Sequence, residues 1–321
     1  MSWFSDGLLY LGRRPHRRAE SALKGPDWAQ ANPARIDRAL ERALALPSGG
    51  WYVACASREV TGKPIAVDVD GVRYVVWRGE SGVHAAPESC PHMGASLEGA
   101  RCEGDAIVCP WHGLHLGPEG HGSWQCVPAH DDGVLVWLQP ANEDVPKTPA
   151  PILAPRPARY IDAVIKVVAT CEPQDVIANR LDPWHGVHFH PHSFATLKVT
   201  DMTDDVLTLR VAYRVLGRLA VEVDATFHCP EPRTIVMTIV GGDGVGSVVE
   251  THATPLGPGR TAIIEATLAT SERPGFRLPL ALSRFVRPYM KKAAERLWVE
   301  DAEYAERRYA LRTEPAREEK A

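Results

Sequence analysis

The chain has no run of 18 apolar residues, so its sequence predicts no membrane-spanning helix. It also has no excess of basic residues, because 36 Lys and Arg stand against 40 Asp and Glu and give a net charge of −4. Nucleic-acid-binding domains are typically basic, so this charge offers no general case for such a partner. Phenylalanine is scarce, with 6 residues in 321, whereas 13 histidines and 9 tryptophans are present. The spacing of the histidines turns out to carry the functional signal.

A secretory pathway is not indicated either. Seven cysteines, an odd number in a long chain, argue against a secreted disulfide framework. Near the N-terminus a short apolar patch at residues 8–11 precedes its arginines, whereas a secretory signal begins with basic residues. We therefore expect a cytoplasmic protein with reduced thiols. The simplest interpretation of the arginines is a solvated arm, and the alternative is contact with a membrane surface or a partner; they are Arg13, Arg14, Arg17 and Arg18.

The length fits one large domain or two ordinary ones, and the local patterns favour two. Residues 1–50 are expected to form a helical extension, because Asn32-Pro33 is a helix start that precedes apolar residues at helical spacing: Ile36, Leu40, Ala43 and Leu44. Residues 51–139 hold short β-type runs separated by Gly- and Asp-rich turns, which predict a small all-β domain. Residues 140–157 include six prolines and resemble an extended linker.

Residues 158–321 have the pattern of an α+β domain. A strand-like segment at 160–169 leads to a predicted helix at 173–180 and then to a histidine-rich loop. Alternating segments follow, at 206–216, 219–227, 234–240, 245–251 and 260–269. Residues 282–312 have helical spacing and strong helix formers. An antiparallel sheet closed by a long C-terminal helix is therefore predicted.

Two loops of the β-rich region each contain one cysteine and one histidine. The sequence reads Cys90-Pro91-His92 and, sixteen residues later, Cys109-Pro110-Trp111-His112-Gly113. Two thiolates and two imidazoles can hold Zn²⁺ or an iron–sulfur cluster. A zinc finger usually places its two cysteines together and its two histidines together. One of each per loop instead favours a [2Fe–2S] cluster with two cysteines on one iron and two histidines on the other.

This pair of loops resembles the Rieske family over roughly residues 51–137. The resemblance implies that two cysteines bind one iron and two histidines the other, the four ligands being Cys90, Cys109, His92 and His112. High-potential Rieske proteins of respiratory complexes carry an extra cysteine in each loop. Ala95 and Trp111 hold those places here, so the chain looks like the oxygenase or ferredoxin type.

A second cluster of histidines follows the predicted helix at 173–180. Residues 179–190 fit the pattern N-x-x-D-x-x-H-x4-H, with Asn179, Asp182, His185 and His190 at its fixed positions. Two histidines and one carboxylate form the facial triad that binds non-haem Fe(II) and leaves positions open for O₂. The pattern resembles the mononuclear-iron motif of Rieske oxygenases, which selects His185 and His190 as ligands. His188 and His192 compete for these roles, and a generic histidine-rich surface loop is the alternative interpretation.

The carboxylate has to come from elsewhere, and in the family it lies on a C-terminal helix. Asp301 lies on the apolar stripe of the predicted helix, whereas Glu300 has charged neighbours at helical spacing and resembles an exposed position. A buried, unpaired carboxylate is costly, and a metal removes that cost. We therefore expect Asp301 to be the third ligand.

Asp182 lies three residues before His185 and resembles the bridging aspartate of the family. That residue joins a mononuclear-iron histidine to a Rieske histidine of the neighbouring subunit, here matched by His112. A carboxylate is a strong acceptor for the free N–H of a metal-bound histidine. The resemblance therefore implies a homo-oligomer, most often a trimer in this family.

The resemblance implies a terminal component of a Rieske non-haem iron oxygenase, with a Rieske [2Fe–2S] domain and a helix-grip (START/Bet v1-like) catalytic domain. The expected cofactors are the cluster and a mononuclear Fe(II). No GxGxxG loop and no plant-type four-cysteine run is present, so a separate reductase or ferredoxin is expected. The rival hypotheses are a Rieske electron carrier with an appended domain and a binding protein with a vestigial iron site.

The substrate is less well defined by the sequence. The modest length resembles members of the monooxygenase type, and we expect a hydrophobic substrate such as a steroid- or carotenoid-like isoprenoid. It would be hydroxylated, demethylated or desaturated. The expected apolar residues of the pocket are Trp184, Phe189, Phe194, Phe285 and Trp298.

Overall fold

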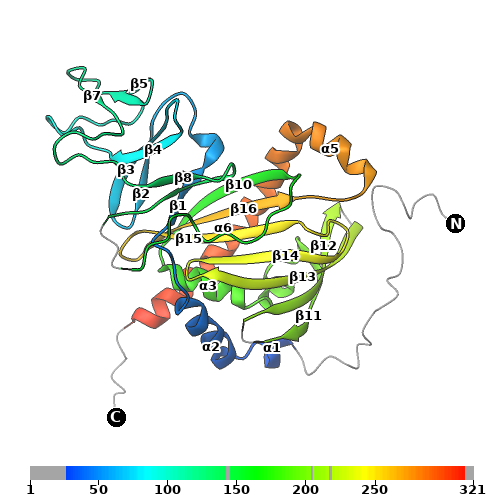
Figure 1. Cartoon of the computed structure of the whole chain (residues 1–321). Helices are drawn as coiled ribbons and strands as arrows, with labels where there is room; N and C mark the ends of the chain where they lie inside the picture. Colours follow the sequence, from blue (N-terminus) through cyan, green and yellow to red (C-terminus); the bar gives the residue numbers. More distant parts are fainter. Residues whose placement is uncertain (1–26, 142–144, 204, 217–218, 315–321) are drawn as a thin grey trace, which may run out of the picture.

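The computed structural model describes residues 27–141, 145–203, 205–216 and 219–314 (Figure 1). Three small antiparallel sheets form the lobe at the upper left of the figure, which we call the β lobe. Their strands are β1 (Tyr52–Ala56), β9 (Leu135–Leu138) and β8 (Ala129–Asp131); β2 (Ile65–Val69), β3 (Val72–Arg78) and β4 (Val83–Pro87); and β5 (Arg101–Glu103), β6 (Ala106–Val108) and β7 (His115–Leu116). A 3₁₀ turn, η2 (Ser57–Glu59), follows β1.

The rest of the chain is built on one seven-stranded antiparallel sheet in the order β10-β16-β15-β14-β13-β12-β11. The strands are β10 (Ile161–Ala169), β11 (Phe194–Met202), β12 (Leu207–Leu216), β13 (Leu219–Glu231), β14 (Thr234–Gly242), β15 (Val248–Gly257) and β16 (Arg260–Ala269). The predicted α+β class is confirmed. The strand β11 was not predicted, because it directly follows the histidine-rich segment and was included in that loop.

The helices of this part are α3 (Pro173–Leu181), α4 (His185–Phe189), α5 (Arg277–Ala281), which follows the 3₁₀ turn η3 (Pro274–Phe276), and α6 (Ser283–Thr313). The two predicted helices at 173–180 and 282–312 are thus confirmed. Pro173 stands at the first position of α3, where its missing N–H costs nothing. The long α6 packs along β10 and brings the C-terminal end of the described chain back over the sheet (Figure 1).

Neighbouring residues of β10 and β16 face opposite sides of the sheet, as the period of two requires. Ile165 and Ile263 join a core with Trp298 of α6. Val164 and Ile264, one position along on each strand, join a different core with Trp137 of the β lobe. The sheet therefore lies between two layers, with α6 on one face and the β lobe on the other.

The N-terminal helices are α1 (Asp27–Gln30) and α2 (Pro33–Leu44), and α2 begins where the sequence predicted a helix. Asn32 caps α2 by accepting a hydrogen bond from the N–H of Ala34. Ile36, Leu40 and Ala43 are buried against α3 and the large sheet, whereas Leu44, expected on the same apolar face, is exposed. The arginines at positions 13–18 lie outside the described residues. None of the described helices is both long and apolar enough to span a membrane.

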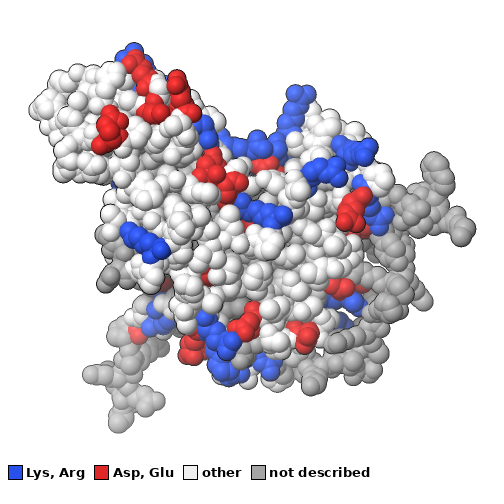
Figure 2. Space-filling model, in the orientation of Figure 1, with Lys and Arg blue, Asp and Glu red and all other residues white. Residues whose placement is uncertain are grey.

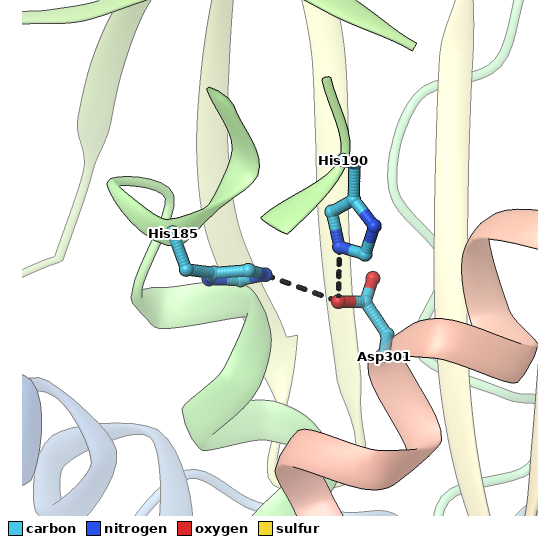
Figure 3. A group of neighbouring side chains, drawn as sticks. All are labelled: His185, His190 and Asp301. Carbon is cyan, nitrogen blue, oxygen red and sulfur yellow. Dashed lines mark hydrogen bonds and ion pairs between the residues drawn. The ribbon is translucent and has the colours of Figure 1, made fainter. Parts of the chain in front are cut away.

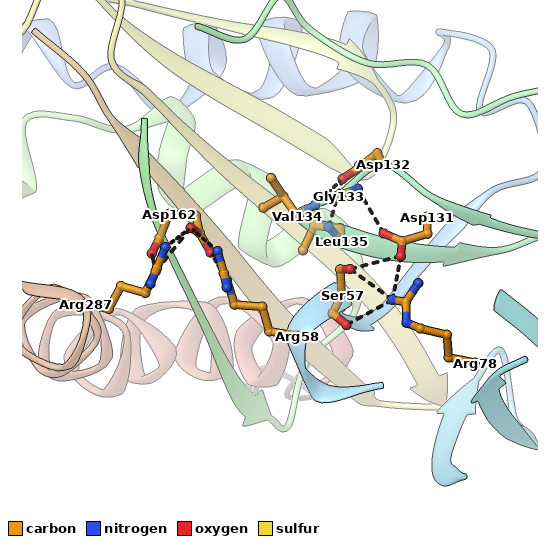
Figure 4. Close-up of polar contacts among 10 residues, drawn as sticks. All are labelled: Ser57, Arg58, Arg78, Asp131, Asp132, Gly133, Val134, Leu135, Asp162 and Arg287. Carbon is orange, nitrogen blue, oxygen red and sulfur yellow. Dashed lines mark hydrogen bonds and ion pairs between the residues drawn. The ribbon is translucent and has the colours of Figure 1, made fainter. Parts of the chain in front are cut away.

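Ion pairs to buried carboxylates connect the β lobe to the large sheet (Figure 4). Asp162 of β10 accepts hydrogen bonds from Arg58 of η2 at 2.7 Å and from Arg287 of α6 at 2.9 Å. In the proline-rich segment, Arg156 lies 2.6 Å from Glu250 of β15 and 2.9 Å from Asp132 of the lobe. Burial favours the neutral acid, yet Arg156 and His252 hold the pKa of Glu250 at about 2. The proline-rich segment is thus attached both to the large sheet and to the β lobe.

Candidate functional site

The two cysteine–histidine loops of the β lobe have the same backbone design. In the first, the N–H of Cys90 donates to the carbonyl of Ala95, and the N–H of Gly94 donates back to the carbonyl of Cys90, both at 2.8 Å. The second repeats both bonds, from Cys109 to Leu114 at 2.8 Å and from Gly113 to Cys109 at 3.0 Å. Gly94 and Gly113 have φ of 75° and 70°, a region that glycine enters without strain. We call residues 90–95 and 109–114 the cluster loops.

The donor atoms of the cluster loops lie in two distinct environments. Cys90 and Cys109 are buried, and their thiols lie within hydrogen-bonding reach of one another. Backbone N–H groups face both sulfurs and favour the thiolate, whereas burial opposes it. His92 and His112 are exposed, with ring centroids 4.8 Å apart. A pair of buried sulfurs beneath a pair of exposed imidazoles fits the two ends of an asymmetric [2Fe–2S] cluster.

A second group of ligands converges on the α6 side of the sheet (Figure 3). His185 begins α4, His190 follows it, and Asp301 projects from α6. Their ligand atoms lie within 4.8 Å of one another, and among the described residues no other group of three or more His, Cys, Asp or Glu converges in this way. We call these residues the His–Asp triad. Two imidazoles and one carboxylate at one point form the donor set of a non-haem iron site.

The hydrogen bonds of the triad give each ring a defined orientation. The Nε2 atoms of His185 and His190 lie 3.0 and 2.8 Å from Oδ1 of Asp301. Burial would raise the pKa of Asp301, but the two imidazoles outweigh it and hold that pKa well below its usual range. Asn179 of α3, fully buried, donates to the same oxygen from Nδ2 at 3.1 Å. All predicted residues of this constellation therefore lie together.

The outward-facing nitrogens of both imidazoles have acceptors. Nδ1 of His185 contacts the backbone carbonyl of Asp182, and the Asp182 carboxylate is farther away, at 3.9 Å. Nδ1 of His190 lies 2.7 Å from Oε2 of Glu300. Metal-binding histidines typically have such an acceptor, which fixes the ring and the tautomer. Glu300 was expected on an exposed face, so its contact with His190 was missed.

The carboxylate of Asp182 is largely buried and only partly bonded. Oδ2 accepts a hydrogen bond from the hydroxyl of Tyr304 at 3.1 Å. Burial and the nearby carboxylate raise the pKa of Tyr304, which therefore stays a donor. Oδ1 of Asp182 is buried and has no hydrogen-bond partner within the described chain. One acceptor thus remains available beside the triad.

The two competing histidines lie outside the triad. His188 is exposed and is not part of the converging group. His192 lies 3.7 Å from Oε2 of Glu300 and lines the adjoining cavity. Neither is placed to substitute for His185 or His190.

A cavity of about 890 Å³ extends from the triad between the sheet and α6. Apolar side chains from strands β12 to β15 form much of its wall: Leu209, Val211, Phe227, Met237, Ile239 and Val249. This size and lining are typical of a small-molecule site. Phe194 lines the cavity as predicted. The other four predicted aromatics do not: Trp184 and Trp298 are buried, and Phe189 and Phe285 are exposed.

The cavity also has a polar end. The guanidinium of Arg180 lies over the rings of Phe227 and Trp298, 5.4 and 5.7 Å from their centroids. Its Nε is buried without a hydrogen-bond partner among the described residues. Glu265 of β16, whose pKa is raised by burial, accepts a hydrogen bond from the indole of Trp298 at 2.5 Å. An apolar ligand with one polar group fits this arrangement.

Two protein-family models match the chain. Residues 141–316, more than half of its length, match a domain of unknown function (DUF5914). Residues 50–148 match the Rieske [2Fe-2S] domain and contain both cluster loops.

Curated relatives match part of the chain, and a solved structure shares its fold. The chain is 38% identical over 76 residues to the vanillate O-demethylase oxygenase subunit of a Pseudomonas species, covering 23% of this chain and 22% of that one. It is 40% identical over 87 residues to the oxygenase component of the chloroacetanilide N-alkylformylase of Rhizorhabdus wittichii, covering 26% and 24%. The alignments thus span about a quarter of either relative. The crystal structure of dicamba monooxygenase bound to dicamba has the same fold, with a TM-score of 0.62, 18% identity and coverage of 83% of this chain and 88% of that one.

Proposed function

Because the chain belongs to the Rieske-type non-haem iron oxygenases, with a DUF5914 domain after its Rieske domain, we propose that it is the terminal oxygenase component of a multicomponent system. The reaction proposed is the oxidation of a mainly apolar organic molecule by O₂. The observation that carries the proposal is the His–Asp triad at the wall of a large apolar cavity.

The donor sets fit both metal centres. Cys90, His92, Cys109 and His112 would hold a [2Fe–2S] cluster, and the His–Asp triad would hold Fe(II). When bound, these groups would supply electron transfer and O₂ activation, which no side chain can provide alone. Asn179 keeps the Asp301 carboxylate in place by donating to Oδ1. The apolar cavity walls exclude water from the space in which the substrate would lie.

The arrangement of layers supports electron delivery between subunits. The β lobe and the His–Asp triad lie on opposite faces of the large sheet. His92 and His112 are exposed, and His112 lies between β6 and β7. Figure 1 shows β7 at the outer end of the lobe, away from α3 and α6. The Asp182 side chain is 12% exposed, and we propose that its carboxylate accepts a hydrogen bond from His112 of the partner subunit once the side chains that cover Oδ1 move aside. A homo-oligomer, for which we propose a trimer, would bring these two groups together.

A separate reductase or ferredoxin is proposed as the electron donor, because neither domain has a nucleotide-binding loop. We place the reaction in the cytoplasm, and the five unpaired cysteines other than Cys90 and Cys109 support a reducing compartment. For the substrate we propose an isoprenoid-like molecule with a polar group. The apolar cavity walls support the isoprenoid-like body, and Arg180 with Glu265 supports the polar group.

The direct test combines metal analysis with oxygen consumption. The purified chain is expected to hold three Fe and two acid-labile sulfides, and to consume O₂ with a reductase, NADH and a substrate drawn from an apolar library. Cys109→Ser should lose the cluster spectrum, whereas Cys126→Ser, which changes a thiol that packs beside the loops, should keep it. Two Fe with no O₂ consumption in any mixture would instead support an electron carrier.

A second prediction concerns Glu300. Glu300→Ala removes the acceptor for Nδ1 of His190, so the third Fe should bind about tenfold to hundredfold more weakly. Competition with a chelator measures this affinity. The iron affinity of Glu300→Gln, which keeps an acceptor oxygen, should lie between those of the unaltered chain and Glu300→Ala. Glu295→Ala, an exposed change on the same helix, is the control. An unchanged iron affinity in Glu300→Ala would show that Glu300 does not position His190.

A further inference from the structure

Residues 277–292, which form α5 and the first turns of α6, have an unusual composition for this chain. They contain five basic residues and no acidic one, although the whole chain carries a net charge of −4. Figure 2 shows Lys and Arg side chains gathered over the α5 region. We call this segment the basic helical surface.

Large apolar side chains form one stripe on the basic helical surface. Leu278, Leu282, Phe285 and Tyr289 are 63%, 43%, 63% and 67% exposed. Leu278 and Leu282 are four residues apart at α5, and Phe285 and Tyr289 are four residues apart on α6, so each pair lies on one side of its own helix. Single exposed apolar residues need no explanation, but a contiguous group marks an interaction site.

The cations beside this stripe are available to a partner. Arg287 is not, since it is bonded to Asp162. The other four, Arg277, Arg284, Lys291 and Lys292, are exposed, and none has an ion pair with a carboxylate in the described parts of the chain. Arg284 lies over the ring of Phe285, 4.6 Å from its centroid, and so borders the stripe directly. Four cations without a carboxylate partner around an apolar stripe complement a surface that is anionic outside and apolar beneath.

The stripe also borders the cavity described above. Tyr289 belongs both to the stripe and to the cavity lining, and Met290, Lys292 and Ala293 continue that lining. The cavity therefore reaches the surface where the apolar stripe ends. An apolar ligand moving between the cavity and this surface would meet little bulk water.

We propose that the basic helical surface docks on anionic phospholipid, with the apolar stripe inserted at the headgroup boundary. The cavity mouth would then face the bilayer. The basic helical surface offers cations and apolar groups but no carboxylate. It therefore lacks the mixed polar contacts that would define a specific protein partner, and it fits an anionic lipid surface better. The docking itself is independent of the proposed oxygenase function, and only its role in substrate entry rests on that function.

Vesicle flotation of the full, metal-loaded chain tests the proposal. The chain should float with vesicles of phosphatidylcholine and phosphatidylglycerol, and much less with phosphatidylcholine alone. Each cation near an anionic surface raises the vesicle partition coefficient about fivefold. Replacing two of them in Arg277→Glu with Arg284→Glu should therefore reduce binding by more than about 25-fold. Leu278→Ser with Phe285→Ser should reduce it by about tenfold or more.

Matched changes at the other end of α6 provide the control. Arg307→Glu with Leu311→Ser replaces an exposed cation and an exposed apolar residue there and should leave binding unchanged. Unaltered cluster spectra and thermal midpoints verify the fold of every variant. Equal binding to neutral vesicles, or equal loss in the control, would overturn the proposal. So would vesicle binding that depends on residues 1–26 alone, or self-association that only the surface variants abolish.

The outcomes separate docking from catalysis. A chain that floats on anionic vesicles but consumes no O₂ with any substrate keeps the docking surface and refutes the proposed function. A chain that turns over a dissolved substrate without binding vesicles keeps the function and refutes the docking surface.

Discussion

Replacing Asp301 by alanine is expected to remove one Fe per chain and to leave two Fe and two acid-labile sulfides in place. Asp301 supplies the only carboxylate of the His–Asp triad, and its Oδ1 is the point on which both imidazoles converge. Loss of a residue that merely supports a metal ligand costs about tenfold to hundredfold in affinity or activity, so loss of the ligand itself should exceed that range. Oxygen-dependent turnover should fall by more than about hundredfold.

Metal analysis and the cluster spectrum check this result together. Asp301→Asn keeps the shape of the side chain without its charge, so it separates metal binding from a packing defect in the alanine variant. Glu303→Ala, an exposed change two positions along α6, should retain all three Fe and full turnover. Three Fe in Asp301→Ala would refute the assignment of the triad as a metal site.

The second large effect is expected at Asp182, where substitution should leave the metal content unchanged, unlike substitution of Asp301. Asp182→Ala should keep three Fe and two sulfides, because the His185 ring contacts the backbone carbonyl of this residue, which the substitution preserves. Turnover should nevertheless fall by more than about tenfold, since the buried carboxylate offers the unpartnered acceptor beside the triad. The reduced cluster should be reoxidised slowly in a single turnover with O₂ and substrate.

Two comparisons distinguish this role from a structural one. Asp182→Asn retains the size and an acceptor oxygen of the side chain and should recover part of the turnover. Asp201→Ala, an exposed aspartate on β11, should behave like the unaltered chain. Normal turnover and normal cluster reoxidation in Asp182→Ala would rule out the bridging role.

The sequence predicted those parts of the site that lie in short local motifs. The resemblance to the iron motif of Rieske oxygenases selected His185 and His190, which lie at the start of one short helix and directly after it. The cluster loops carry their ligands within single turns, and Asp301 was recognisable as a polar residue on an apolar helix face. The fold class followed from alternating segments for the same reason, because each pattern is local.

The features that the sequence did not predict depend on which other part of the chain packs against a helix. Glu300 has Arg296 four residues before it, a pattern typical of a solvated face, yet His190 approaches it from another part of the chain. Phe285 was expected to line the cavity, but the helix turns it outward at the start of α6. Helical periodicity identifies which residues share a face, and only tertiary packing decides what that face meets.

The position of the large sheet between α6 and the β lobe has a genetic consequence under the proposed function. Each chain would donate electrons to one neighbour and receive them from another, a head-to-tail relation that closes into a ring. A defect in the cluster loops of one copy would then silence the iron of its neighbour and not its own. Two inactive alleles, one without a cluster and one without a triad, would complement each other when their products assemble in the same ring.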